Sequence, residues 1–207
     1  MENQFEGQNM LGIFLDSETN GLDPNYHRII EIAFKIIDLY TGDIKEIYQT
    51  IVKQSDETFE KSDLESLKIN QITLNEIKNG KEEKQVAEEI INCFEQNKIN
   101  NSNSVFICQN PSFDRMFLSQ IIPSQKQNYL NWPYHWLDLA SMYWSISIKK
   151  GKEQHNFFPW ETGFTKDLIA SFYNIPSEKK PHRAMNGVNH LIACYTAVVG
   201  FPYSEKK

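Results

Sequence analysis

Asp16 and Glu18 lie two residues apart at the end of an apolar run, and they are the side chains best placed to do chemistry. Side chains alternate between the faces of a strand, so positions two apart point the same way and these carboxylates converge on one small volume. Two like charges so close repel each other unless a cation lies between them, and hard divalent cations prefer carboxylate oxygens. A solvated pair of acids at a strand end is the alternative, and the other motifs must decide between the two.

Two more motifs supply side chains of matching chemistry. Asp114 follows the apolar run 105–108 at the expected start of a helix, where sheet enzymes often present functional side chains. His182 comes directly before the last expected helix, and the ordinary pKa of histidine suits proton transfer near neutral pH. A third carboxylate and a proton acceptor are therefore available.

The elements that must position these residues follow from the pattern of apolar side chains. Alternating or β-branched runs predict strands at 11–16, 29–38 and 44–53, the last two joined by a turn at 41–43, and further strands at 105–108 and 136–139. Helical spacing predicts an amphipathic helix at 82–96 and helices at 113–122, from 139 through 146, at 163–173 and at 183–199, with loops and short helical turns over 56–80. Strands come first and then alternate with helices, which favours an α/β fold with a mixed five-stranded sheet flanked by helices.

Composition limits what the chain does. Its 207 residues, 40% of them hydrophobic, are enough for one core, so we expect a single domain over 1–207 with the core at about 10–200. A net charge of −6 argues against nonspecific binding of long nucleic acid, which requires many lysines and arginines. The three widely spaced cysteines suggest neither a disulfide framework nor a zinc site. With no signal-peptide pattern and no membrane-spanning run, we expect a cytoplasmic protein with no membrane partner.

With these motifs in hand, the chain resembles the DEDDh branch of the DnaQ-like 3′→5′ exonucleases, which have an RNase H-like fold. The segment DSETNGL matches the first family motif, DxETxGL, and NPSFD matches the second, NxxFD. HRAMNG matches the third motif, HxAxxD, in all but its last residue. The order and spacing of the motifs also agree over residues 11–199, and three ordered motifs are far more specific than any one alone.

The resemblance implies a hydrolase that uses two Mg²⁺ or Mn²⁺ ions, about 4 Å apart, to release mononucleotides from single-stranded DNA or RNA ends. It implies that Asp16 bridges the two ions, Glu18 holds the ion that carries the attacking water, and Asp114 supports the other. His182 is the implied general base. The implied nucleic-acid contacts are Thr19, Asn20, Gly21, Leu22, Asn110 and Phe113, with Leu22 as an apolar wedge against the terminal base.

Gly187 departs from the family pattern, because it stands where the family has its fourth carboxylate, five residues after the histidine. Glycine offers no ligand and destabilises a helix interior by about 1 kcal/mol relative to alanine. We therefore expect impaired activity, through a natural loss of catalysis or an engineered change that traps substrate. Asn186 and His190 are the nearby side chains able to replace the ligand. The alternative is a noncatalytic nucleic-acid-binding or interaction module derived from an exonuclease, and neither DNA against RNA nor any protein partner is assigned.

Overall fold

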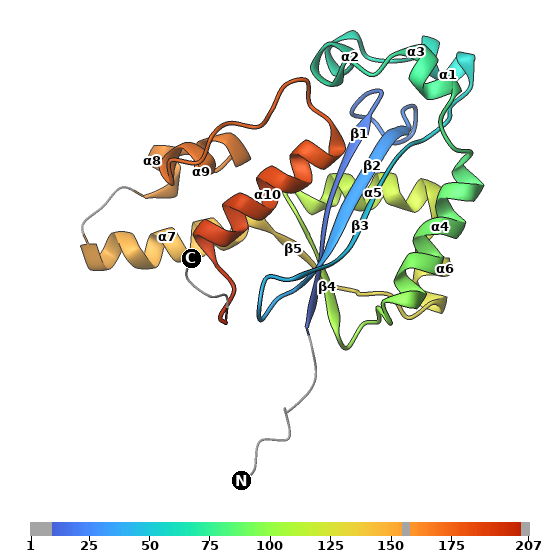
Figure 1. Cartoon of the computed structure of the whole chain (residues 1–207). Helices are drawn as coiled ribbons and strands as arrows, with labels where there is room; N and C mark the ends of the chain where they lie inside the picture. The colour runs from blue at the N-terminus through green and yellow to red at the C-terminus, as the bar shows by residue number, and fades with distance from the viewer. Residues whose placement is uncertain (1–9, 155–157, 204–207) are drawn as a thin grey trace.

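The computed structural model describes residues 10–154 and 158–203, and its centre is one mixed sheet. The strands are β1 (Leu11–Thr19), β2 (Ile29–Asp38), β3 (Ile44–Ile51), β4 (Ser104–Cys108) and β5 (Trp136–Asp138), in the spatial order β3-β2-β1-β4-β5 (Figure 1). β1 is antiparallel to β2 and parallel to β4, so it lies at the change of direction in the sheet. The strand order also reverses at β1, and ligand sites in open sheets are common at such a reversal.

Helices flank the sheet and extend beyond it (Figure 1). Those of the first half are α1 (Asp56–Glu60), α2 (Leu64–Asn70), α3 (Leu74–Lys78) and α4 (Glu83–Gln96). They are followed by α5 (Pro111–Ile121), α6 (Ser124–Tyr129), α7 (Leu139–Gln154), α8 (Pro159–Thr162), α9 (Lys166–Phe172) and α10 (Ala184–Val198). Within the described residues, no helix combines the length and the apolar character that crossing a membrane requires.

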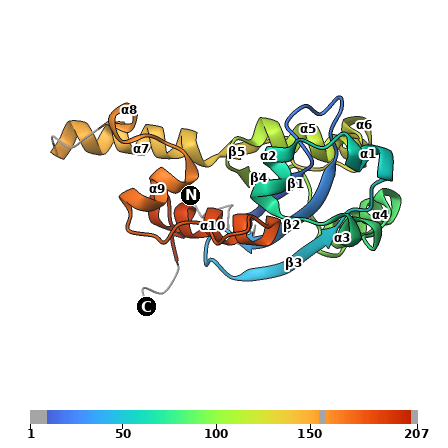
Figure 2. The ribbon, with the colours of Figure 1, turned by 90° about the horizontal axis from the view of Figure 1, so that it is seen from above.

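Two apolar layers hold the helices against opposite faces of the sheet. Ile13 and Leu15 of β1 belong to a core that includes apolar side chains of α4 and α5. Phe14 belongs to a second core, formed with α7, α9 and α10. Figure 2 shows the sheet between these two groups of helices. Because β1 side chains alternate, Asp16 continues the face of Phe14 toward α10, and Ser17 faces α5.

The predicted α/β fold with a mixed five-stranded sheet is confirmed, and most differences lie at element ends. β2 has the predicted bounds, whereas β1 continues three residues past the expected end, so that Glu18 lies within the strand. The helices α6 and α8 were not predicted. α6 is short and polar, and α8 has only 4 residues, so neither has a hydrophobic periodicity to detect.

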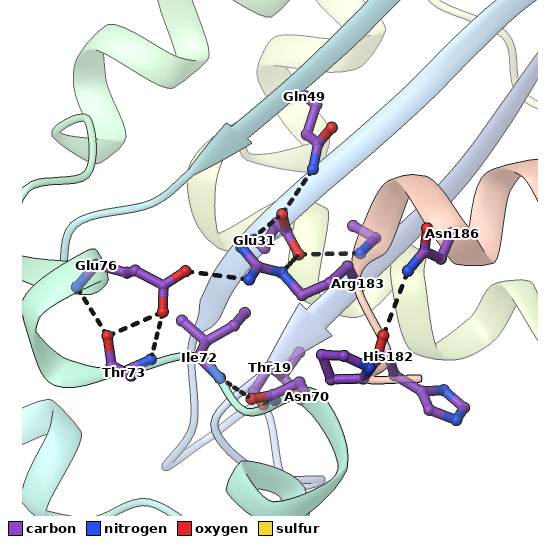
Figure 3. A network of polar contacts seen from close by, with 12 residues as sticks. Thr19, Glu31, Gln49, Asn70, Ile72, Thr73, Glu76, His182, Arg183 and Asn186 are labelled. Carbon is purple, nitrogen blue, oxygen red and sulfur yellow. Dashed lines mark hydrogen bonds and ion pairs between the residues drawn. The ribbon is translucent and has the colours of Figure 1, made fainter. Parts of the chain in front are cut away.

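A buried ion pair joins α10 to the sheet directly after His182. Glu31 of β2 is 1% exposed and accepts hydrogen bonds from Arg183 Nε at 3.0 Å and from the Ala184 backbone N–H at 3.0 Å. Arg183 Nη1 also donates to Glu76 of α3 at 3.0 Å. Figure 3 shows this network with the His182 imidazole pointing away from it. The pair therefore fixes where α10 begins and where His182 lies relative to β1.

We predict that Arg183→Met lowers the free energy of unfolding by about 2–3 kcal/mol, because Glu31 would be left buried without its cation while keeping other hydrogen bonds. Urea denaturation measures the change. The matched control is Arg115→Met, since the Arg115 guanidinium lies 5.7 Å from the Tyr134 ring centroid and makes no ion pair in the described chain. A loss below about 1 kcal/mol is expected there. Equal losses in the two variants would contradict the anchoring role.

Candidate active site

The carboxylates of Asp16 and Glu18 project from the end of β1 on the side of α10. Glu18 is directly opposite Glu31 of β2, and the register shifts between Glu18 and Thr19, where β2 carries an extra residue. Such bulges often occur beside active sites, where they redirect side chains. Within the described residues, no basic side chain forms an ion pair with Glu18, whereas Glu31 has Arg183. Glu18 is therefore a carboxylate without an ion-pair partner among the described residues.

Asp114 approaches the same strand end from the other side. It lies in the first turn of α5, is 5% exposed, and its Oδ1 accepts a hydrogen bond of 2.8 Å from the Ser17 hydroxyl. Burial, and then the negative charge of Asp16, raise the pKa of Asp114 well above its ordinary value. Asp114 is therefore close enough to Asp16 for their charges to interact, as a shared cation would require.

Lys166 and Glu178 complete the cluster, and neither was predicted from the sequence. Lys166 is the first residue of α9, and its Nζ lies 3.4 Å from Asp16 Oδ1 and 2.8 Å from Glu178 Oε2. Glu178 is 8% exposed and lies in the segment before α10. An acid four residues before His182 was the available signal for Glu178. Lys166 gave none, because a lysine at the start of a helix is usually solvated.

The crowding of carboxylates changes their acidity. Burial raises the pKa of Asp16 to about 6, with the Lys166 ammonium opposing this rise and the Glu178 charge adding to it. Burial raises the pKa of Glu18 further, to about 8, with the charges of Asp16 and Glu178 as the next causes. Lys166 is also buried, but the negative charges of Asp16 and Glu178 raise its pKa above the ordinary value. Burial and the neighbouring charges thus raise the pKa of Glu18 more than that of Asp16, which has Lys166 as an ion-pair partner.

Glu18, Glu178 and His182 form the group of potential metal ligands that the structure brings together. One ligand atom from each lies within 4.8 Å of the others. Glu178 Oε1 is buried, makes no hydrogen bond, and lies 3.3 Å from His182 Nδ1. Two carboxylates and an imidazole fit one divalent ion such as Mn²⁺. Of the predicted metal ligands Asp16, Glu18 and Asp114, only Glu18 is in this group. Asp16 pairs with Lys166 instead, and Asp114 accepts a hydrogen bond from Ser17.

Gly187 lies directly against the Asp16 carboxylate. A Cβ atom on Gly187 would lie 2.2 Å from Asp16 Oδ2, which is far inside van der Waals contact. The Asp16 carboxylate can therefore lie in its present position only because residue 187 is a glycine. The two proposed replacements for the missing acid are not in the ligand group: Asn186 donates to the Pro181 carbonyl at 3.3 Å, and His190 Nδ1 lies 3.7 Å from Glu178 Oε2.

Two of the predicted nucleic-acid contacts have structural roles. The Thr19 hydroxyl donates to the Gly21 carbonyl at 2.7 Å. The Asn20 side chain has no exposed surface, donates to the Thr58 carbonyl at 2.9 Å, and accepts from the Arg28 backbone N–H at 2.7 Å. Asn20 therefore joins the turn after β1 to α1, and its amide group is not free to contact a nucleotide.

The other predicted contacts differ in exposure. Leu22 is 70% exposed at the tip of the turn, in keeping with a wedge. Gly21 is buried, and a Cβ there would lie 2.3 Å from the His27 ring, so the turn requires glycine. Asn110 is exposed at the start of α5 in the left-handed conformation, and Phe113 packs against Phe117 with ring centroids 4.7 Å apart. A role in binding nucleic acid stays a prediction for all four.

The comparison with protein families identifies the class of this site. The model of the RNase T exonuclease family matches residues 13–186, which is most of the chain. DNA polymerase III PolC-type of Thermotoga petrophila is 32% identical over 136 residues, which make up 65% of this chain and 9% of that protein. The corresponding Thermotoga maritima protein is 30% identical over 130 residues, 63% of this chain and 8% of that protein. The chain thus spans about a tenth of the length of these curated relatives.

Solved structures agree on the fold. Escherichia coli exonuclease I in its zinc-bound complex with single-stranded DNA superposes with a TM-score of 0.72 at 19% identity, covering 93% of this chain and 40% of that one. The complex of the same enzyme with a dT13 oligonucleotide gives a TM-score of 0.72 at 18% identity, covering 93% and 41%. The mixed sheet with flanking helices is their RNase H-like exonuclease fold. The chain therefore belongs to the exonuclease family, in its DnaQ-like (DEDDh) branch, with Gly187 in place of the fourth acid.

Proposed function

We propose that the chain is a metal-dependent 3′→5′ exonuclease that releases mononucleotides from single-stranded DNA or RNA ends. The observation that carries this proposal is the meeting of Asp16, Glu18 and His182 at the end of β1, where Glu178 adds a buried carboxylate. A divalent cation bound there would supply Lewis acidity, polarising the phosphodiester and easing deprotonation of water. The membership of the family supports hydrolysis.

In this proposal the carboxylates bind the cation and His182 transfers a proton. Glu18 and Glu178 supply carboxylate oxygens for the cation, and Asp114 and Asp16 add to the negative field around it. His182 accepts the proton of the attacking water, and the negative charge of Glu178, whose Oε1 lies 3.3 Å from His182 Nδ1, favours the protonated ring that results. The ion pair of Glu31 and Arg183 holds α10, and therefore His182, in place.

A hollow on the outer side of α5, which none of the site's acids lines, is the path that we propose for the strand beyond its terminal nucleotide. It measures about 700 Å³ and lies between Pro24, in the turn that carries Leu22, and the outer side of α5. Arg115 and Trp136 line it together with the Ser112 hydroxyl. A guanidinium beside an aromatic ring suits a phosphate and a stacked base. The oligonucleotide complexes of exonuclease I support a single-stranded substrate for this chain too.

A noncatalytic binding module remains the second candidate, and one observation favours it. The Lys166 ammonium is bonded to Asp16, the residue that would otherwise bridge two ions. A chain with glycine in place of the family's fourth acid and with a lysine bonded to Asp16 fits an exonuclease whose catalysis is impaired. Binding and hydrolysis must therefore be measured separately.

We predict that hydrolysis with Mn²⁺ requires a free 3′ hydroxyl. The assay compares mononucleotide release from a 3′-hydroxyl oligomer, a 3′-phosphorylated oligomer and a closed circle at fixed salt, with affinities for the same three measured in Ca²⁺. We expect release from the first and at least tenfold weaker binding of the circle, because the exposed Leu22 would act as a wedge against a terminal base and the net charge of −6 does not favour internal binding. Tight binding of the circle without hydrolysis would support the noncatalytic module.

We also predict opposite effects from two substitutions of Gly187. Gly187→Asp should raise the hydrolysis rate by about 10²–10³-fold, the usual effect of one transition-state electrostatic group. Gly187→Ala should lower the rate, since it imposes the same displacement on Asp16 without adding a ligand. Single-turnover rates on a 3′-hydroxyl oligomer measure both. If alanine and aspartate have the same effect, the missing carboxylate does not limit hydrolysis.

A further inference from the structure

We propose that the Lys166 ammonium takes the place of one of the two divalent ions, and that the chain binds a single divalent ion between Glu18 and Glu178, beside His182. The inference rests on the proposed nuclease site and specifies its cation content. Two ions are what the resemblance implied, and the contacts of Lys166 give the reason for expecting one. Neither Lys166 nor Glu178 belongs to the motifs that carry the resemblance.

Lys166 is held in the cluster as an internal cation. Its side chain is 15% exposed, with Nζ 3.4 Å from Asp16 Oδ1 and 2.8 Å from Glu178 Oε2. Thr165 caps α9 by accepting from the Leu168 backbone N–H at 3.4 Å, and so fixes the residue that precedes Lys166. An ammonium held between two carboxylates neutralises the charge that a divalent ion would otherwise neutralise. It also occupies the Asp16 oxygen that an ion would need.

Gly187 lies closest to one oxygen of the Asp16 carboxylate, and Lys166 bonds to the other. The Asp16 carboxylate rests against Gly187, where a Cβ would be 2.2 Å from Oδ2, while Oδ1 accepts from Lys166. A side chain at position 187 would push the carboxylate from this position. The glycine at position 187 and the lysine at position 166 are therefore physically linked. Asp16 occupies the space that a side chain at position 187 would fill, and the Lys166 ammonium supplies positive charge that a second ion would otherwise supply.

The remaining ligands define where one ion binds. Glu18, Glu178 and His182 have ligand atoms within 4.8 Å of one another. Glu178 is more than nine-tenths buried, and its Oε1 makes no hydrogen bond, although His182 Nδ1 lies 3.3 Å away. A buried oxygen without a partner is costly unless something binds it. Glu18 makes no ion pair within the described residues and has a ligand atom in the same group, so one divalent ion satisfies both carboxylates.

Calorimetric titration of the substrate-free chain with Mn²⁺, checked by electron paramagnetic resonance of the bound ion, tests the proposal. We expect one Mn²⁺ per chain. Lys166→Met should bind a second ion or bind the first at least tenfold more tightly, because Asp16 and Glu178 lose their internal cation. Glu178→Gln should weaken binding at least tenfold. The matched control Lys84→Met removes a lysine whose side chain is 89% exposed and should change nothing.

Two Mn²⁺ ions or none in the unmodified chain would overturn the proposal, and so would an unchanged count and affinity in Lys166→Met. The count in the unmodified chain decides the matter even if Lys166→Met fails to fold. Where that variant folds, its thermal stability should recover with Mn²⁺ more than that of Lys84→Met. A chain that hydrolyses 3′ ends with two ions bound refutes this inference and leaves the proposed function standing. A chain that binds one ion but hydrolyses no 3′ end refutes the proposed function and leaves this inference standing.

Discussion

The repulsion between carboxylates at the end of β1 is the constraint on which the rest of the site depends. Asp16, Glu18, Glu31 and Glu178 are brought together from three parts of the chain, and Asp114 adds its charge from α5. Buried carboxylates remain charged only where cations or hydrogen bonds stabilise them. Arg183 neutralises Glu31, and Lys166 is shared by Asp16 and Glu178. Glu18 has no ion-pair partner among the described residues, which is why we propose that the metal ion binds there.

The fold places these charges by holding rigid elements against the two faces of β1. Phe14 packs on the α10 side and Ile13 and Leu15 on the α4 and α5 side, so the positions of the acids that follow them are set by the apolar residues before. The pair of Glu31 and Arg183 then ties the start of α10 to β2 (Figure 3). The ion pair that neutralises Glu31 thereby also positions the His182 imidazole beside Glu178.

The strands and the principal helices were predictable from the sequence because their apolar patterns are strong, as in β2, where the predicted and observed bounds agree. The motif acids were predictable because strand alternation puts Asp16 and Glu18 on one face. Lys166 and Glu178 were not, since their importance comes from contacts across 150 residues and 12 residues of chain, respectively, and from burial that composition does not reveal. The contact between Gly187 and the Asp16 carboxylate could not be predicted either, because it depends on how closely the α10 backbone approaches β1.

The most direct test is anomalous X-ray scattering from crystals of the unmodified chain soaked in Mn²⁺. The account predicts one anomalous peak, between the carboxylates of Glu18 and Glu178 and beside His182, with Lys166 Nζ still bonded to Asp16. Two peaks bridged by Asp16, with the Lys166 ammonium displaced from the cluster, would contradict it.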